Sequence, residues 1–522
     1  MRIFLVINLS IFLVLQLFAE VNYRSGNYYL EMQEFLIPTG GKALNVKRVY
    51  NSRSTRIGAF GFGWTFNFDI QLKILPGGVL LIIDEDGRKI KVIAKNSKEM
   101  FDSDIAALSK KATDLSIIKK IKEEKDQEKV ADYFAKNGVE PNIPVDTEYY
   151  GYGGWRGYEV VKKTTKGWIR TIGHSGEKQL FDLQGRLVKF LDPNGNYVLL
   201  SYENNKLYQI INPYKQVVTF HWNKSNFIKS IKAIDGKLFS YMYNDKKLLT
   251  EAKHAKFGIY KFDYDRLYNL TKITYPTGDT KVLEYETKFD LVVSEKGPGR
   301  LDVKYQYGRN PKDHKHYWTV ISVPYGKDYR EIDRWEYWED QDKYLRIQEG
   351  SRIETQFSKF GSGSPSYINR DGRVTKFQYN SVGQPIERVL PNGTKITTEY
   401  NKTFGKPEKV IDGADIYYYS YNSKGNINVA KNNHGVQVNI TYDNKGRITT
   451  IHNNKKGIFY FVFNEIGKPT KITKKGVGVV NIKYDSDGKI IDIKTQPEDG
   501  KIASLIISTF QELFSLLKYA SI

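Results

Sequence analysis

Aromatic residues beside carboxylates are the part of this sequence whose chemistry best suits ligand binding. The segment RWEYWEDQDKY (334–344) places Trp335, Tyr337 and Trp338 next to Asp340, and Trp318 lies shortly before it. Aromatic rings can stack on a sugar ring while carboxylates accept hydrogen bonds from its hydroxyl groups. These five residues are the candidate ligand-binding site. Paired carboxylates also serve glycoside hydrolases, and the same aromatic residues could instead fill the wall of an irregular repeat.

Residues with the chemistry of a metal centre or a nucleophile are few. His314 and His316 would share one face of a strand, but no third ligand can be assigned. The segments DEDG (84–87) and DSDG (485–488) begin like calcium loops but lack the Glu required at the twelfth position, which favours hairpin turns. GSGS (361–364) is interpreted as a flexible loop, and the chain has no Cys. We therefore expect no catalytic residue, no metal and no cofactor.

The elements that must position these residues follow a repeat. An aromatic residue followed by Asp, Asn or Glu recurs in two runs, from Phe181 to Tyr285 and from Tyr379 to Tyr484. A fixed period of this length indicates a repeat architecture. The intervals are 20 or 21 residues in the first run and 21 residues throughout the second. We interpret the second-run aromatic residues as structural anchors: Tyr379, Tyr400, Tyr421, Tyr442, Phe463 and Tyr484.

Each unit contains two short strands and two turns. Between Tyr442 and Phe463, DNKG (443–446) is expected to form the first turn and NNKKG (453–457) the second. The Asp or Asn after the aromatic residue would cap the first turn. A long strip of such hairpins must coil because sheets twist. The predicted fold class is therefore mostly β: a spiral antiparallel β-strip built from hairpin repeats of about 21 residues.

Two segments depart from this pattern and have helical spacing. Between residues 100 and 137, apolar residues such as Ile105 and Leu108 recur every three or four positions, and KKIKEEKDQEKVADYF continues the helix. This insertion either packs on the sheet or forms a plug or partner-binding arm. Residues 496–522 carry an apolar stripe typical of an amphipathic helix. That helix could cap the last strands, enter the shell lumen, dock a partner or lie on a membrane, which is the only membrane contact we expect.

The N-terminus has the pattern of an export signal. Arg2 precedes an apolar run that ends at Phe18, and small Ala19 follows. We expect a signal peptide over residues 1–19 and an exported protein that is periplasmic, on the cell surface or secreted. The formal net charge of +21 either serves solubility in a lysine-rich proteome or favours anionic partners. The basic residues form no dense block, so we expect no specific nucleic-acid partner.

The repeat resembles that of the YD-repeat, or Rhs, proteins. Its pattern is clearest in YDNKGRITTI (442–451), FDLQGRLVKFLDPNGN (181–196) and YNSVGQPIERVLPNGT (379–394). Residues 26–69 are similar to the domain that opens many Rhs proteins, on an RxYNS and GxGW pattern matched by Arg48, Tyr50, Asn51, Ser52, Gly61, Gly63 and Trp64. The resemblance implies a shell-like β-fold. Some relatives enclose a C-terminal toxin, and others act at cell surfaces.

The autoproteolytic aspartate segment of the toxin-enclosing relatives is not found. DPNG (192–195) resembles part of it but is interpreted as a repeat turn, and we expect no toxin domain after the repeats. The predicted function is an exported, non-enzymatic scaffold that binds glycan or protein at the cell surface or in the periplasm. The alternative is a shell component of an Rhs or toxin-complex-like system that encloses a separately encoded toxin or effector cargo.

These patterns divide the chain into seven predicted segments. They are a signal peptide (1–19), an Rhs-type N-terminal β-domain (20–95), a helical insertion (96–150), the first run of YD repeats (151–299), irregular aromatic-rich repeats (300–378), the second run of YD repeats (379–495) and a C-terminal amphipathic helix (496–522).

Overall fold

The structure is a computed structural model that describes residues 18–37, 43–112, 116–124, 126–151, 159–173, 175–234, 236–299, 302–485, 490–498 and 500–520. The predicted signal peptide lies outside the described residues except for its last two positions, where strand β1 (Phe18–Asn22) begins. Most of the DSDG segment also lies outside them.

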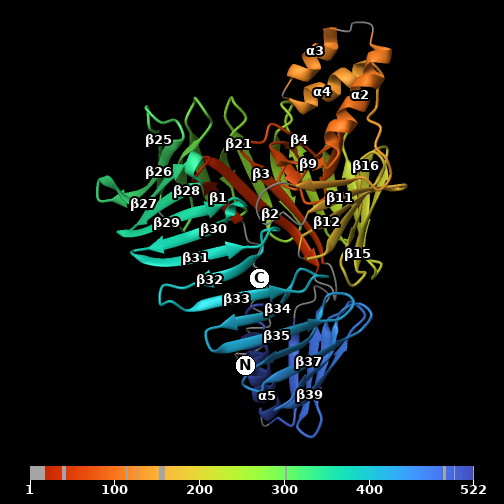
Figure 1. Cartoon of the computed structure of the whole chain (residues 1–522), viewed down its shortest axis with the longest axis vertical. Coiled ribbons are helices and arrows are strands. Elements are labelled where there is room, and N and C mark those ends of the chain that lie inside the picture. The colour runs from red at the N-terminus through yellow and green to blue at the C-terminus, as the bar shows by residue number, and fades with distance from the viewer. Residues whose placement is uncertain are drawn as a thin grey trace.

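One antiparallel strip of 36 strands, β7 to β42, dominates the molecule, and each strand pairs with the next along the chain (Figure 1). This confirms the predicted fold class. The strip opens with β7 (Gln71–Leu75), β8 (Val79–Ile83), β9 (Lys89–Ala94), β10 (Glu148–Gly151), β11 (Val160–Thr164) and β12 (Gly167–Ile172). The first run of repeats comprises β13 (Glu177–Phe181), β14 (Leu187–Leu191), β15 (Tyr197–Glu203), β16 (Lys206–Ile211), β17 (Val217–Trp222), β18 (Ile228–Lys232), β19 (Leu238–Tyr243), β20 (Leu249–His254), β21 (Gly258–Tyr264), β22 (Leu270–Thr274), β23 (Thr280–Tyr285) and β24 (Val292–Lys296).

Longer strands follow in the irregular region, and the regular repeat then resumes. The irregular strands are β25 (Val303–Arg309), β26 (His316–Tyr325), β27 (Asp328–Trp338), β28 (Lys343–Gln348), β29 (Ser351–Ser358) and β30 (Gly361–Arg370), with a short helix η2 (Glu339–Gln341). The second run comprises β31 (Arg373–Tyr379), β32 (Pro385–Val389), β33 (Lys395–Tyr400), β34 (Pro407–Asp412), β35 (Asp415–Tyr421), β36 (Ile427–Asn432), β37 (Gln437–Tyr442), β38 (Ile448–Asn453), β39 (Gly457–Phe463), β40 (Pro469–Lys474), β41 (Gly478–Tyr484) and β42 (Ile490–Gln496). GSGS (361–364) opens β30, where Gly361 pairs with Ser358 of β29, so its interpretation as a loop is wrong.

In the five second-run units from Tyr379 to Phe463, the turn after the anchor is capped as the sequence predicts. Asp443 Oδ1 accepts hydrogen bonds from the backbone N–H groups of Lys445 and Arg447, both at 2.9 Å. Gly446 has a φ of +79°, which closes the turn. The DEDG and DPNG segments form turns of the same kind, because Gly87 donates to the Asp84 carbonyl and Gly195 to that of Asp192.

Each anchor also marks a β-bulge. The pairing register shifts between Thr441 and Tyr442, and a shift recurs at all six second-run anchors. The Tyr442 hydroxyl donates to the Ile427 carbonyl at 2.7 Å, fifteen residues earlier, which ties neighbouring repeats together. A bulge bends its strand and increases local twist. The regular bulges therefore explain why the strip coils.

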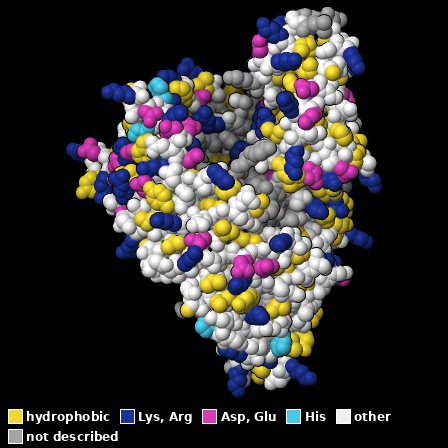
Figure 2. Space-filling view, viewed as in Figure 1, with side chains coloured by type: hydrophobic (Ala, Val, Ile, Leu, Met, Phe, Trp, Pro, Cys, Tyr) yellow, Lys and Arg dark blue, Asp and Glu magenta, His cyan; other side chains and the backbone are white. Residues whose placement is uncertain are grey.

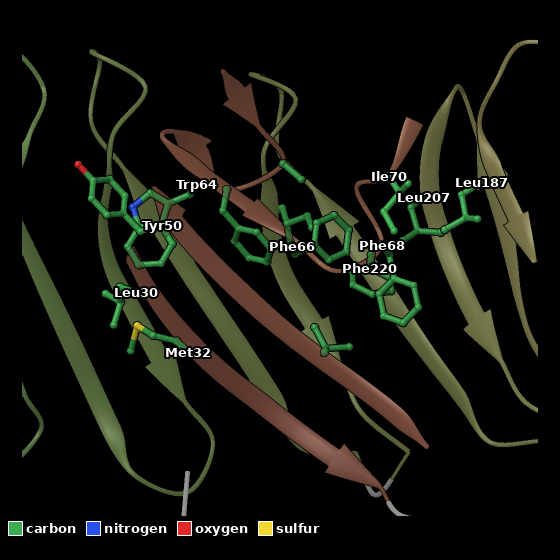
Figure 3. Packing of buried hydrophobic residues seen from close by; sticks show 14 of the residues in the cluster. Leu30, Met32, Tyr50, Trp64, Phe66, Phe68, Ile70, Leu187, Leu207 and Phe220 are labelled. Atoms are coloured by element: carbon green, nitrogen blue, oxygen red, sulfur yellow. The ribbon is translucent and has the colours of Figure 1, made fainter. Parts of the chain in front are cut away.

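A four-stranded sheet lies inside the first run of the strip. Its strands run in the order β1, β2 (Asn27–Ile37), β3 (Leu44–Asn51) and β6 (Trp64–Phe66), and a small hairpin, β4 (Ile57–Gly58) with β5 (Gly61–Phe62), lies beside it. Figure 3 shows residues of this N-terminal segment, such as Phe68, beside Leu207 and Phe220 of the wall. All of them belong to one buried core. We call this N-terminal sheet, together with its turns and the β4–β5 hairpin, the plug.

The plug and the wall also exchange hydrogen bonds. At the position opposite the bulge, the wall turns an N–H group inward. The N–H of Ile228 donates to the Ala59 carbonyl at 2.9 Å, and that of Leu270 donates to the Tyr50 hydroxyl at 2.9 Å. Because buried backbone donors need partners, these bonds fix where the plug lies along the wall.

The helical insertion connects the paired strands β9 and β10 and contains three helices: α2 (Ser97–Lys111), α3 (Ser116–Glu123) and α4 (Gln127–Lys136). The prediction of one continuous helix is wrong, since α4 has its own N-cap in Asp126. The helices share a small core that includes Leu108 and Phe134. Figure 2 shows the surface hollowed between this insertion and the opposite rim of the strip. None of the described helices has both the length and the hydropathy of a bilayer-spanning segment.

The second run wraps around the C-terminal helix α5 (Lys501–Leu516), which Figure 1 shows within the lower part of the strip. Ile506 and Leu513 of α5 are buried against wall residues from β33 to β42. The Tyr419 hydroxyl donates to the Leu516 carbonyl at 2.6 Å. The helix therefore fills the inner side of this run, which is the lumen placement among the four alternatives that the sequence left open.

Two contacts fix the spiral. Near its start, an isolated bridge joins Gln71 to Arg186, which closes strands β7 to β14 into a ring. One turn later, Asn426 Nδ2 donates to Asn194 Oδ1 at 2.6 Å although the residues are 232 positions apart. Asn194 belongs to the DPNG turn, so this turn joins successive turns of the spiral. We call the contact around Asn194 the seam.

An aromatic pocket between the plug and the inner wall

Strand alternation sorts the predicted site residues onto two faces of the wall. In the β26–β27 pair, Tyr317 lies opposite Tyr337 and Thr319 opposite Trp335, while Trp318 lies opposite Glu336. Directly opposed residues in an antiparallel pair share a face. The Thr319 hydroxyl donates to the Tyr23 carbonyl of the plug at 2.6 Å, so the face with Trp335 and Tyr337 is the inner one.

A cavity of about 310 Å³ lies on that inner face. Trp335 and Tyr337 form its wall together with Tyr344 and Phe357, and the hairpin turn after β1 contributes Tyr23 from the plug. The ring centroids of Trp335 and Tyr344 lie 5.1 Å apart, and those of Tyr344 and Phe357 lie 5.4 Å apart. The pocket therefore has a continuous aromatic wall that crosses three strands.

Ion pairs and hydrogen bonds hold these rings in place. Arg346 forms an ion pair with buried Asp333 at 2.7 Å, its guanidinium lies 4.9 Å from the Trp335 ring, and the Trp335 indole N–H donates to Asp333 at 3.2 Å. Arg24 Nε donates to the Tyr317 hydroxyl at 2.8 Å. Burial raises the pKa of Tyr337 well above its ordinary value, so its phenol remains neutral across the physiological range.

The rim of the pocket carries both signs of charge. Glu20, Glu339 and Asp342 line it together with Arg24 and Lys343. Lys343 forms an ion pair with Glu354 at 2.9 Å. The structure gives the carboxylates of Glu20, Glu339 and Asp342 no hydrogen-bond partner among the described residues, so these oxygens are open to a ligand.

Trp318 belongs to a separate cluster on the outer face. It lies beside His316, whose imidazole stacks on Trp338 at 4.6 Å with an interplanar angle of 10°. Glu336 accepts hydrogen bonds from Arg334 and His316, which lower its pKa although burial acts in the opposite direction.

The five predicted ligand residues are therefore only partly brought together. Trp335 and Tyr337 form the inner pocket, and Trp338 borders it from the strand end while stacking outward. Trp318 faces outward, and Asp340 is exposed in η2 away from the pocket lining. Tyr23, Arg24, Tyr344 and Phe357 line the pocket without having been predicted. Strand alternation could have identified the face of Tyr344, but the plug residues carry no comparable signal.

The two histidines do not lie on one strand face. Strand β26 begins at His316, and His314 lies in the turn before it, so the prediction that both share one strand face is wrong. Among the residues that the structure describes, no three His, Asp or Glu side chains lie close enough together to hold a metal ion.

Two family models match the chain. A domain of unknown function, DUF6531, matches residues 19–92, and the teneurin YD-shell matches residues 395–513. No curated protein sequence matches the chain significantly. Among solved structures, the chain is similar to the Photorhabdus luminescens Tc holotoxin pore with a TccC3 mutation (8% identity) and to TcdB2-TccC3 without its hypervariable C-terminal region (9% identity), each with a TM-score of 0.40. Each comparison covers 90% of this chain and 26% of the solved one, so this chain spans about a quarter of their length.

Proposed function

Because this chain is an Rhs/YD-repeat protein by its repeats and its two family matches, we propose that it is a non-enzymatic shell component that holds a separately encoded polypeptide against its inner wall. The chemistry of that wall supports the proposal. It combines aromatic anchors with inward backbone groups, a surface that suits polypeptide. The partner class is a toxin or effector cargo, and the compartment is outside the cytoplasm, as the N-terminal signal pattern suggests.

The single observation that carries this proposal is that the wall already holds two polypeptide segments of its own chain. The first run holds the plug through a shared apolar core and hydrogen bonds such as that of Leu270 to Tyr50. The second run holds α5 through a second core and the bond from Tyr419. A wall that binds both a sheet and a helix is suited to further polypeptide. The irregular strands between the two runs offer a wall with a cavity beside it.

Native mass spectrometry of the protein purified from its own cells tests this function. We expect a second polypeptide that remains bound under native conditions and is released on mild denaturation. A bare chain in every preparation would contradict the shell proposal.

A second candidate function is a scaffold that binds glycan or protein at the cell surface or in the periplasm. The aromatic pocket favours it, because its cavity lies within the size range of small-molecule sites. Binding of the purified chain to envelope material from its own cells tests this function. Retention that glycosidase treatment of the envelope abolishes indicates a glycan, and retention that protease treatment abolishes indicates a protein. Absence of retention would contradict it.

A further inference from the structure

The pocket is composite, because neither the plug nor the wall forms it alone. Tyr23 of the plug lies with its ring centroid 5.8 Å from that of Trp335, and Arg24 reaches across to the Tyr317 hydroxyl. The wall contributes Tyr337, Tyr344 and the indole of Trp335. These residues come from segments about 300 positions apart, so a ligand in the pocket touches both bodies.

The rim indicates the charge of the ligand. Carboxylates of Glu20, Glu339 and Asp342 would repel an anion. A cation would compete with groups already in place, because the guanidinium of Arg24 lies 5.8 Å from the Tyr337 ring and that of Arg346 lies over Trp335. The groups left open are aromatic rings and unpartnered carboxylate oxygens, and the ligand that matches both is a neutral molecule with an apolar face and hydroxyl groups.

A sugar ring in the pyranose form meets both requirements. Its C–H face packs on aromatic rings, and its hydroxyl groups donate to carboxylate oxygens that lack a partner. We propose that the pocket binds one or two rings of a neutral oligosaccharide, with the plug turn on one side and the aromatic wall on the other. This inference rests on the second proposed function and is independent of the first.

The experiment is a binding screen with the full-length protein. The probes are neutral tetrasaccharides (cellotetraose, maltotetraose and chitotetraose), a heparin-derived tetrasaccharide as the anionic probe and choline as the cationic probe. Isothermal titration calorimetry measures affinity. Trp335→Ala removes the largest ring of the pocket, and Trp335→Phe retains an aromatic ring in case the alanine variant fails to fold. Trp318→Ala is the matched control, because it removes a tryptophan from the outer face of the same strand pair.

We expect at least one neutral tetrasaccharide to bind saturably. Trp335→Ala should weaken that binding by about tenfold or more, Trp335→Phe by less, and Trp318→Ala should leave it unchanged, because truncation of a buried aromatic contact dominates small interfaces. Tyr23→Ala should also weaken it, since the site is composite. Three outcomes would overturn the proposal: no neutral probe binds, only heparin or choline binds, or Trp335→Ala binds as the wild type does. Retention on envelope glycans that survives Trp335→Ala would leave the second function in place and move its site elsewhere.

Discussion

The two runs of repeats share one sequence pattern but enclose different elements, a sheet in the first run and a helix in the second. The edge and loops of the plug present free carbonyls and a hydroxyl, which accept inward N–H groups of the wall such as that of Leu270. A helix satisfies most of its backbone groups internally and offers few such acceptors. In the second run, the corresponding wall positions include Pro385, Pro407 and Pro469, which have no N–H group.

This difference shows how one repeat pattern can enclose either a sheet or a helix. The position opposite the bulge faces inward in both runs, and its carbonyl accepts the next anchor hydroxyl in both, for example Pro407 from Tyr421 and Ile228 from Tyr243. Only the N–H differs. Where a sheet can accept it the donor is kept, and at three positions of the run that encloses a helix, proline removes it. The other three second-run positions, Ile427, Ile448 and Ile490, keep the donor, so proline distinguishes half of this run from the first.

The largest loss of stability that we expect in one run alone comes from breaking the buried ion pair of the plug. Arg48 and Glu34 form an ion pair with almost no exposure, and the Arg48 guanidinium lies 4.9 Å from Trp64. Arg48→Met leaves the Glu34 carboxylate buried without its partner, so we expect the free energy of unfolding of the first run to fall by about 3–5 kcal/mol. Urea unfolding with hydrogen exchange measures it.

The control for that prediction is the double variant Arg48→Met with Glu34→Leu, which removes both charges and should recover most of the loss. Hydrogen exchange in the α5 region should remain unchanged in the single variant. Equal loss of protection in both runs would show that the two contents do not stabilise their runs separately.

The seam offers a test of whether the runs are coupled. A Cβ on Gly446 would lie 2.3 Å from Cγ of Asn194, and its φ is +79°. Gly435 has a similar φ of +73° but open space around its Cβ position. We expect Gly435→Ala to cost about 1–2 kcal/mol from backbone strain alone. Gly446→Ala should cost about 1–3 kcal/mol more because of the clash. Thermal unfolding measures both, and equal losses would mean that the seam contributes nothing.

Removing one acceptor tests the backbone difference directly. Tyr50→Phe deletes the hydroxyl that accepts the Leu270 N–H in a buried site, so we expect a loss of about 1–3 kcal/mol. Pro407→Ala in the second run instead adds an N–H and unfolded-state freedom, for which we expect a loss of about 0.4–1 kcal/mol. Chemical denaturation of the two variants gives the comparison. A larger loss for Pro407→Ala would contradict the role we assign to proline.

As pH falls, the first run should lose stability before the second run does. His254 donates from Nε2 to the Glu34 carbonyl at 2.8 Å, while Nδ1 accepts from the N–H of Lys256 at 3.0 Å, so the ring is neutral. Burial lowers its pKa below the ordinary 6.5, outweighing the charge and the carbonyl of Glu34, which raise it, and the charge of Arg48 lowers it further. As pH falls, the unfolded chain therefore takes up the proton before the folded chain does. The stability that neutral His254 contributes is present above pH 6.5 and is lost as pH falls from there towards the folded pKa.

The expected slope is at most about 1.4 kcal/mol per pH unit, measured as the free energy of unfolding between pH 7 and pH 5. His254→Gln should flatten the slope. His434→Gln is the matched control, because that histidine lies in the second run at an exposed position beside Asp415. An unchanged slope in His254→Gln would contradict the assignment.

Local features of the fold could be predicted from the sequence, but contacts between distant segments could not. The turn at Asp443 and the period of the anchors follow from short-range patterns, because an Asx cap and a glycine with positive φ act within five residues. Alternation along one strand also predicts that Trp335 and Trp338 lie on opposite faces of the sheet. The meeting of Tyr23 with Trp335 depends on where the plug lies along the wall, and no local pattern encodes that position.

The smallest expected change in stability tests the hydroxyl group of the anchor residue. Phe463 occupies the one second-run anchor position without a hydroxyl, although its bulge is the same as that beside Tyr442. Phe463→Tyr should donate to the carbonyl fifteen residues earlier, that of Ile448, as Tyr442 does to Ile427. We expect a gain of about 0.5–1.5 kcal/mol, and Tyr442→Phe should lose a similar amount. Thermal unfolding measures both. If only Tyr442→Phe changed stability, the carbonyl of Ile448 would have another partner, and the repeats of the second run would differ among themselves as the two runs do.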